Sequence, residues 1–224
     1  MIKIYEELDQ GSDEWLAARC GILTASEVKL IVTPTGKPAN NDNTRAHVYE
    51  LAAQRITKYV EPAYISDDML RGMMDEATAR DLYSGNYALA KEVGFITNDS
   101  LGFTMGYSPD GLVGDDGLVE IKSRRQKFQI ESIVTNEVPK EHKLQLQTGL
   151  LVSGREWVDY ISYSAGLPLF VKRVFVDGEM RANIIEAAKA FEKKVTETVW
   201  KFRANSKSLV KTERNTDPDA ISIL

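Results

Sequence analysis

Cysteine and histidine are scarce in this chain of 224 residues, which contains one Cys and two His. Cys20 has no second cysteine with which to form an internal disulfide, so a disulfide-stapled secreted scaffold is excluded. A single thiol also excludes sites that need four thiolates, such as a four-cysteine zinc site or an iron–sulfur cluster. We therefore expect a protein of the cytoplasm that folds on its hydrophobic core alone.

Long apolar runs and an excess of positive charge are also missing. No window holds 18 consecutive apolar residues, and the N-terminus is acidic where a signal peptide would be basic and then apolar. We expect neither export nor a membrane-spanning helix. The 28 Lys and Arg against 33 Asp and Glu give a net charge of -5. That balance excludes an overall basic coat, but a local basic surface, such as residues 122–127 or 189–211, can still face a nucleic acid or simply be solvated.

The hydrophobic pattern predicts helices before and after a central group of strands. The predicted helices cover residues 12–19, 27–31, 45–58, 66–92, 140–153 and 181–202, and the predicted strands 103–107, 118–121, 158–164 and 169–176. This order indicates an α/β or α+β fold with a mixed sheet. We expect one domain over residues 1–204 and a C-terminal tail over 205–224, which is either a disordered end or a subunit contact.

The most informative motif is Pro109-Asp110 followed, ten residues later, by Glu120-Ile121-Lys122. Each half alone is typical of ordinary structure, a turn and a strand fragment respectively. Together they predict a hairpin through residues 114–117 that returns the chain toward Asp110. Glu120 and Lys122 are two residues apart on a strand and so point to the same face. Two carboxylates and one ammonium are then expected to converge.

Such a cluster suits a hard divalent cation. Mg²⁺ prefers carboxylate and carbonyl oxygens and keeps several waters, and Asp110, Glu120 and the backbone carbonyl of Ile121 offer such ligands. Lys122 beside them can orient or deprotonate a water and offset charge on a phosphate. Neither His47 nor His142 falls in the motif, so a histidine-based mechanism is not expected. The predicted chemistry is phosphodiester hydrolysis.

These residues resemble the PD-(D/E)xK nuclease superfamily, and more closely the phage lambda exonuclease-like, YqaJ-type alkaline exonucleases. The further matches, in the order of that family, are residues 10–15 (QGSDEW), Arg19, Gly21, residues 24–26 (TAS), Gly72, Glu76, Ala79, Arg80, Ser108 and residues 145–147 (QLQ). The resemblance implies an α/β, restriction-endonuclease-like core with a central mixed β-sheet flanked by helices.

The resemblance also implies roles for single residues. Arg19, Ser26 and Ser108 would bind the 5′-phosphate of a DNA end, where the planar guanidinium and neutral hydroxyls suit a phosphate. Their ordinary alternatives are a surface salt bridge and helix caps. Glu76 would add a carboxylate to the metal site, although it also has an i,i+4 partner in Arg80. Gln147 would face the site, and its alternative is a solvent-facing helix position.

Weaker matches concern contacts with the DNA strands. Lys37 is the nearest basic residue in a loop where the family leads us to expect an arginine, and Arg124 and Arg125 are candidates from their local charge. Met69 or Leu70 stands where the family places an apolar wedge that splits the terminal base pair. Apolar residues at such positions are otherwise plain helix core.

The function that the resemblance implies is a metal-dependent 5′-to-3′ exonuclease. It would degrade one strand of linear double-stranded DNA from a 5′-phosphorylated end and leave 3′ overhangs for recombination. Mg²⁺ is the expected cofactor, two ions per site, with Mn²⁺ as a substitute. The expected partners are DNA ends, two further copies in a homotrimeric ring and a single-strand annealing protein, in the host cytoplasm if the chain is phage-encoded. A structure-specific or restriction-like endonuclease, and a non-catalytic DNA-binding subunit, remain as alternatives.

Overall fold

The strands are arranged in two four-stranded sheets in the computed structural model, which describes residues 1–62 and 66–214. One sheet has the order β1-β3-β4-β2 and the other β5-β6-β7-β8, and each mixes parallel and antiparallel pairs. The strands are β1 (Ile2–Tyr5), β2 (Leu23–Thr24), β3 (Phe95–Asn98), β4 (Met105–Tyr107), β5 (Gly111–Val113), β6 (Gly117–Ser123), β7 (Trp157–Tyr163) and β8 (Phe170–Phe175). The expected α/β class with mixed sheets flanked by helices is confirmed, with the strands divided between two sheets.

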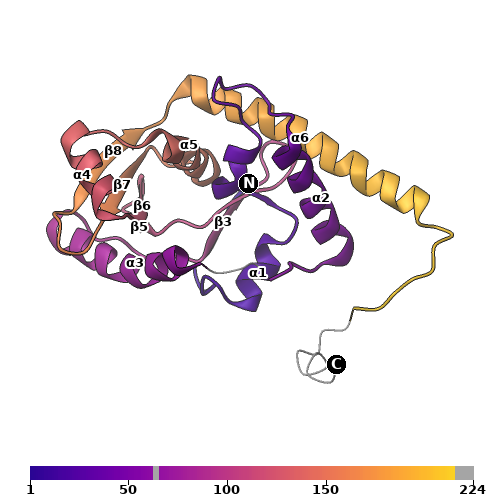
Figure 1. Ribbon diagram of the computed structural model, residues 1–224, viewed down its shortest axis with the longest axis horizontal. Coiled ribbons are helices and arrows are strands. Elements are labelled where there is room, and N and C mark those ends of the chain that lie inside the picture. Colours follow the sequence, from indigo (N-terminus) through magenta and orange to yellow (C-terminus); the bar gives the residue numbers. More distant parts are fainter. Residues whose placement is uncertain (63–65, 215–224) are drawn as a thin grey trace.

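Helices α1, α2, α3 and α6 begin at polar capping residues. The side chains of Ser12, Asn41, Ser66 and Asp177 each accept a backbone N–H from the first turn that follows. The helices are α1 (Asp13–Arg19), the 3₁₀ helix η1 (Ala25–Leu30), α2 (Asp42–Thr57), α3 (Asp67–Asn86), α4 (Gln126–Thr135), α5 (Lys140–Ser153) and α6 (Gly178–Asn205). Helix α6 extends past α2 as a long rod (Figure 1).

Helix α5 lies in the middle of the molecule. Its residues from Leu146 to Val152 are all buried, and it packs between the two sheets, η1 and α6 (Figure 1). Helix α3 covers the opposite face of the second sheet, where Tyr83 joins Val119 and Ile121 in a separate apolar cluster. Strand β6 therefore turns its odd-numbered side chains toward α3. Its even-numbered side chains, which include Glu120 and Lys122, face the α5 side.

Several boundaries differ from the sequence prediction. The helix predicted over 66–92 ends at Asn86, and Lys91 pairs with Leu112 in an isolated bridge. Gly85 does not interrupt that helix. Strands β1, β2, β3 and β5 and helix α4 were not predicted. The tail expected over 205–224 lies partly outside the described residues. None of the described helices combines the length and the apolar character needed to cross a lipid bilayer.

Candidate functional site

The segment Ser108-Pro109-Asp110 connects the two sheets, running from the end of β4 to the start of β5. Its backbone is held by side chains from distant parts of the chain. Gln10 donates to the carbonyl of Pro109 at 3.1 Å, and Arg80 donates to the carbonyl of Asp110 at 2.8 Å. The same guanidinium nitrogen of Arg80 binds Glu76 at 2.8 Å. The segment therefore has a fixed path, and Glu76 is tied to it through Arg80.

Asp110, Glu120 and Lys122 gather as the sequence predicts. The carboxylate of Asp110 accepts the backbone N–H of Ile121 at 2.5 Å, which attaches it to the middle of β6. Glu120 pairs with the ammonium of Lys122 at 2.5 Å. Asp110 is 9% exposed and Glu120 1% exposed, so both carboxylates lie where water screens charge poorly.

Glu120 receives two further donors. Tyr107, at the end of β4, donates its hydroxyl at 2.7 Å, and Gln145 of α5 donates its side-chain amide at 2.5 Å. Tyr107 was not singled out from the sequence, although its place directly before Ser108 could have drawn attention to it. The three donors hold a buried carboxylate in one orientation.

Gln147 does not reach this cluster, contrary to our expectation. It is buried, donates to the carbonyl of Phe175 at 2.8 Å and accepts the backbone N–H of Asp177 at 2.8 Å. It therefore connects α5 to the chain between β8 and α6. Gln145, two residues earlier, takes the position next to Glu120, because residues two apart on a helix point about 200° away from each other.

The electrostatics of the cluster favour a bound cation. Burial, the charge of Glu120 and, to a smaller extent, that of Glu76 raise the pKa of Asp110 well above its usual value. Burial alone would lower the pKa of Lys122, but Glu120 and Asp110 outweigh it, so that its pKa is raised and the ammonium stays charged. A positive ion near Asp110 would relieve the repulsion between the two carboxylates.

The donor set is that of a hard, partly hydrated cation. Asp110 and Glu120 offer carboxylate oxygens, whereas Ile121 is seen to contribute its N–H to Asp110. Glu76 lies close enough to influence Asp110 but is paired with Arg80. Within residues 1–62 and 66–214, no three acidic, His or Cys side chains group tightly enough to hold an ion on their own. Such an ion would need water or substrate oxygens as well, as Mg²⁺ usually does.

A second group of polar side chains lies on the other side of Ser108. The hydroxyl oxygen of Ser108 accepts from Trp15 Nε1 at 3.0 Å and from Arg19 Nη1 at 3.2 Å, and its own hydrogen goes to none of the described residues. The guanidinium of Arg19 stacks on the ring of Trp15, 4.1 Å from the ring centroid. Among the described residues, Arg19 has no carboxylate within ion-pair distance, so the expected surface-salt-bridge alternative is not seen. Ser26 is exposed and lies beside Thr24, with 3.3 Å between the hydroxyl oxygens.

The three basic residues that are candidates for DNA contact differ in their exposure and in their partners. Arg124 is largely buried, where it contacts Glu141 at 3.1 Å and His142 at 2.7 Å. Arg125 is exposed and pairs with Asp68 of α3 at 3.1 Å. Lys37 is exposed in a turn whose backbone is bonded to Thr33.

Met69 and Leu70 lie in the first turn of α3. Met69 is 52% exposed and Leu70 49% exposed, so neither belongs to the helix core. The next residue of α3, Arg71, binds Ser123 at the end of β6, which places this turn of the helix beside the second sheet. The two apolar side chains are therefore presented to solvent on the side of the molecule where β6 ends.

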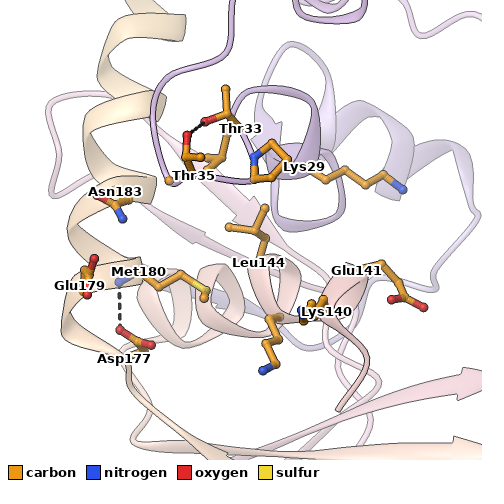
Figure 2. Close-up of a pocket in the computed structure, with 14 residues that line it drawn as sticks. Lys29, Thr33, Thr35, Lys140, Glu141, Leu144, Asp177, Glu179, Met180 and Asn183 are labelled. Carbon is orange, nitrogen blue, oxygen red and sulfur yellow. Dashed lines mark hydrogen bonds between the residues drawn. The ribbon is translucent and has the colours of Figure 1, made fainter. Parts of the chain in front are cut away.

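A groove of about 820 Å³ lies between the loop of residues 33–36 and the beginnings of α5 and α6 (Figure 2). Figure 2 shows Met180 extending from α6 toward α5, with Lys140 and Glu141 at the other side. Glu141 also pairs with Arg124, which directly follows the end of β6, so the groove reaches the end of that strand. Asp110, Glu120 and Lys122 do not line it.

Known proteins share both the sequence pattern and the fold. A model of the YqaJ-like viral recombinase domain matches residues 14–156, which contain Asp110, Glu120 and Lys122. The chain belongs to the YqaJ-like viral recombinase family. A solved structure similar to this YqaJ-like chain is that of an alkaline exonuclease, LHK-Exo, from Laribacter hongkongensis. It is 32% identical, with a TM-score of 0.78 over 89% of this chain and 100% of that one.

Two other comparisons add to this result. The structure of LHK-Exo in complex with dAMP gives a TM-score of 0.79 at 32% identity, again over 89% of this YqaJ-like chain and 100% of that one. A phage-related exonuclease from Haemophilus somnus 129PT has a TM-score of 0.60 at 12% identity, covering 81% of this chain and 96% of that one, which shows the shared fold alone. No curated protein matches the chain.

Proposed function

We propose that the protein is a metal-dependent exonuclease that degrades one strand of linear double-stranded DNA in the 5′-to-3′ direction. It starts at a 5′-phosphorylated end and leaves a 3′ single-stranded overhang for recombination by strand annealing. The observation that carries the proposal is the convergence of Asp110, Glu120 and Lys122 at the junction of the two sheets, in a chain of this family.

Asp110 and Glu120 would hold Mg²⁺, or Mn²⁺ in its place, with Glu76 and the carbonyl of Ile121 completing a site for two ions. The bound metal would supply Lewis acidity and an activated water. Lys122 is fixed by its ion pair with Glu120, so its ammonium can donate to the water or to a phosphate oxygen as negative charge develops there. Tyr107 and Gln145 keep Glu120 in position for this work.

The 5′-phosphate would bind beside Ser108. Arg19 has N–H groups, and Ser108 a hydroxyl hydrogen, that no described residue uses, so both can donate to an anion. Ser26 is exposed at the same place. Arg125, Lys37 and the apolar pair Met69 and Leu70 would contact the strands nearby. A homotrimeric ring, an annealing partner and a cytoplasmic location complete the proposal on the strength of the family.

The test compares three DNA substrates in Mg²⁺: a linear duplex with 5′-phosphate, the same duplex with 5′-hydroxyl, and a covalently closed circle. Wild type should consume the phosphorylated linear duplex fastest and leave the circle intact. Lys122→Ala should lose this activity, while Lys193→Ala, which removes an exposed lysine on α6, should keep it. Cleavage of the circle would indicate an endonuclease, and cleavage insensitive to Lys122→Ala would refute the assignment of the site.

A further inference from the structure

Behind the residues proposed to bind the end phosphate lies the carboxylate of Glu27, in η1. One of its oxygens, Oε2, accepts both donors of Thr24, the backbone N–H at 2.9 Å and the hydroxyl at 2.7 Å. Thr24 and Glu27, the N-cap and N3 residues of η1, thus form a capping box. Thr24 is buried, and the Glu27 side chain is 28% exposed.

The bond to Glu27 decides how the hydroxyl of Thr24 can act. A hydroxyl has one hydrogen, and here that hydrogen goes to Glu27, so Thr24 Oγ1 can only accept from its other neighbours. Those neighbours are Ser26 Oγ at 3.3 Å and Arg19 Nη2 at 3.5 Å. Ser26 must therefore be the donor in its contact with Thr24. Thr24 Oγ1 becomes an acceptor to which a serine hydroxyl and a guanidinium both turn.

The carboxylate of Glu27 also lies near a buried histidine. The ring of His47 is buried with Nε2 3.7 Å from Oε2, and it stacks on Phe191 of α6 at 5.2 Å between ring centroids. The charge of Glu27 also acts on Arg19. Burial lowers the pKa of Arg19, and the charge of Glu27 partly offsets that effect.

We infer that Glu27 is a positioning residue for 5′-phosphate recognition, acting through Thr24 on Arg19. This inference rests on the proposed function, since it assumes that Arg19 binds the end phosphate. Glu27 touches neither the phosphate nor the reacting atoms. It fixes the direction of the Thr24 hydroxyl bond, and with it the acceptor to which the Arg19 guanidinium turns.

The readout is the ratio of kcat/KM for duplex with 5′-phosphate to kcat/KM for the same duplex with 5′-hydroxyl. A purely structural defect lowers both terms alike and leaves the ratio unchanged. Glu27→Ala should lower the ratio about tenfold, because losing a hydrogen bond to a charged group costs at least that factor. Glu27→Gln should restore most of it, since a single oxygen accepts both Thr24 donors and an amide oxygen can do the same.

Thr24→Val removes the hydroxyl while keeping Glu27, and it should lower the ratio as far as Glu27→Ala does. The double variant should lose no more than either single variant, because both act on one pathway. Asn41→Ala is the matched control: it removes a cap from α2 and should lower thermal stability without changing the ratio.

The outcomes separate the two claims. A wild type that degrades both duplexes equally well would overturn the end-phosphate assignment, and this inference with it. A wild type that prefers the phosphorylated end, combined with an unchanged ratio in Thr24→Val, would overturn the role of Glu27 alone. Thr24→Val and Glu27→Gln decide the question even if Glu27→Ala fails to fold.

Discussion

Replacing Gly149 with Ala should loosen Glu120 from a distance, through the ring of Tyr107. Gly149 is buried in α5, and a Cβ atom added there would lie 2.8 Å from Cζ and 2.9 Å from Cε1 of Tyr107. Ordinary contacts begin at 3.4 Å, so the ring would have to move by 3.4 minus 2.8, or 0.6 Å. The phenol hydroxyl, now 2.7 Å from Glu120, moves with it.

The stability change has two parts of opposite sign. Alanine favours a helix over glycine by about 1 kcal/mol, whereas overpacking a buried ring costs about 1–3 kcal/mol. Gly85→Ala in α3 is the matched control, because a Cβ there would meet nothing within 4 Å. Gly149→Ala should therefore be less stable than Gly85→Ala by about 1–3 kcal/mol. For a chain of this size, each kcal/mol moves the midpoint of thermal unfolding by about 2–4 °C.

Thermal unfolding and the rate of duplex degradation test the two consequences separately. Gly149→Ala should reduce both stability and degradation, and Tyr107→Phe should reduce degradation without the steric cost. A Gly149→Ala protein as stable and as active as Gly85→Ala would refute the packing argument. A fully active Tyr107→Phe would show that Glu120 needs no hydroxyl donor from β4.

Four further outcomes are expected. Gln145→Ala should lower the degradation rate with little change in thermal stability. Gln147→Ala should lower stability by about 1–2 kcal/mol, because it removes two partly buried hydrogen bonds to the backbone; equal stabilities in the two unfolding curves would contradict this assignment. Mg²⁺ at ten times its Kd should stabilise the wild type by about 1.4 kcal/mol. A chelator should reverse the gain, and Asp110→Asn should abolish it; a gain that persists in that variant would place the ion elsewhere. Arg125→Ala should reduce the salt slope of DNA binding by about one unit, and an unchanged slope would count against contact there. Burial, with Lys122 nearby, lowers the pKa of His142 from 6.5 to about 4. The unfolded chain therefore binds the proton first, and the free energy of unfolding, measured with urea, should fall by at most about 3 kcal/mol as pH drops from 6.5 to 4. His142→Gln should remove that part of the pH dependence.

The sequence was informative where its local pattern is strong. Residues two apart on a strand share a face whatever the rest of the fold does, so the pairing of Glu120 with Lys122 could be predicted from β6 alone. The hairpin that returns β6 to Asp110 followed from the glycines at 114 and 117. Helices with a polar cap and a long apolar face, such as α6, were also placed within a few residues of their ends.

What the sequence did not reveal depends on tertiary packing. Gln145 and Gln147 are the same residue type on one helix, and only the rotation of α5 against β6 decides which reaches Glu120. Strands β1 and β3 have four residues each, and β3 is buried throughout, so neither shows the alternation that predicts a strand. The division into two sheets depends on these short strands. Tyr107 entered the site because that division brings the end of β4 next to β6.

The short link from Ser108 to Asp110 sets a fixed distance between two parts of the proposed active site. Ser108 belongs to the proposed end-phosphate pocket and Asp110 to the acidic cluster, and two residues of extended chain span at most about 7 Å. Gln10 and Arg80 hold the carbonyls of this link, so its length cannot adjust to the substrate. With the terminal phosphate bound at Ser108, the first internucleotide linkage is the one within reach of Asp110. Each turnover would then release a single nucleotide and create the same kind of end for the next.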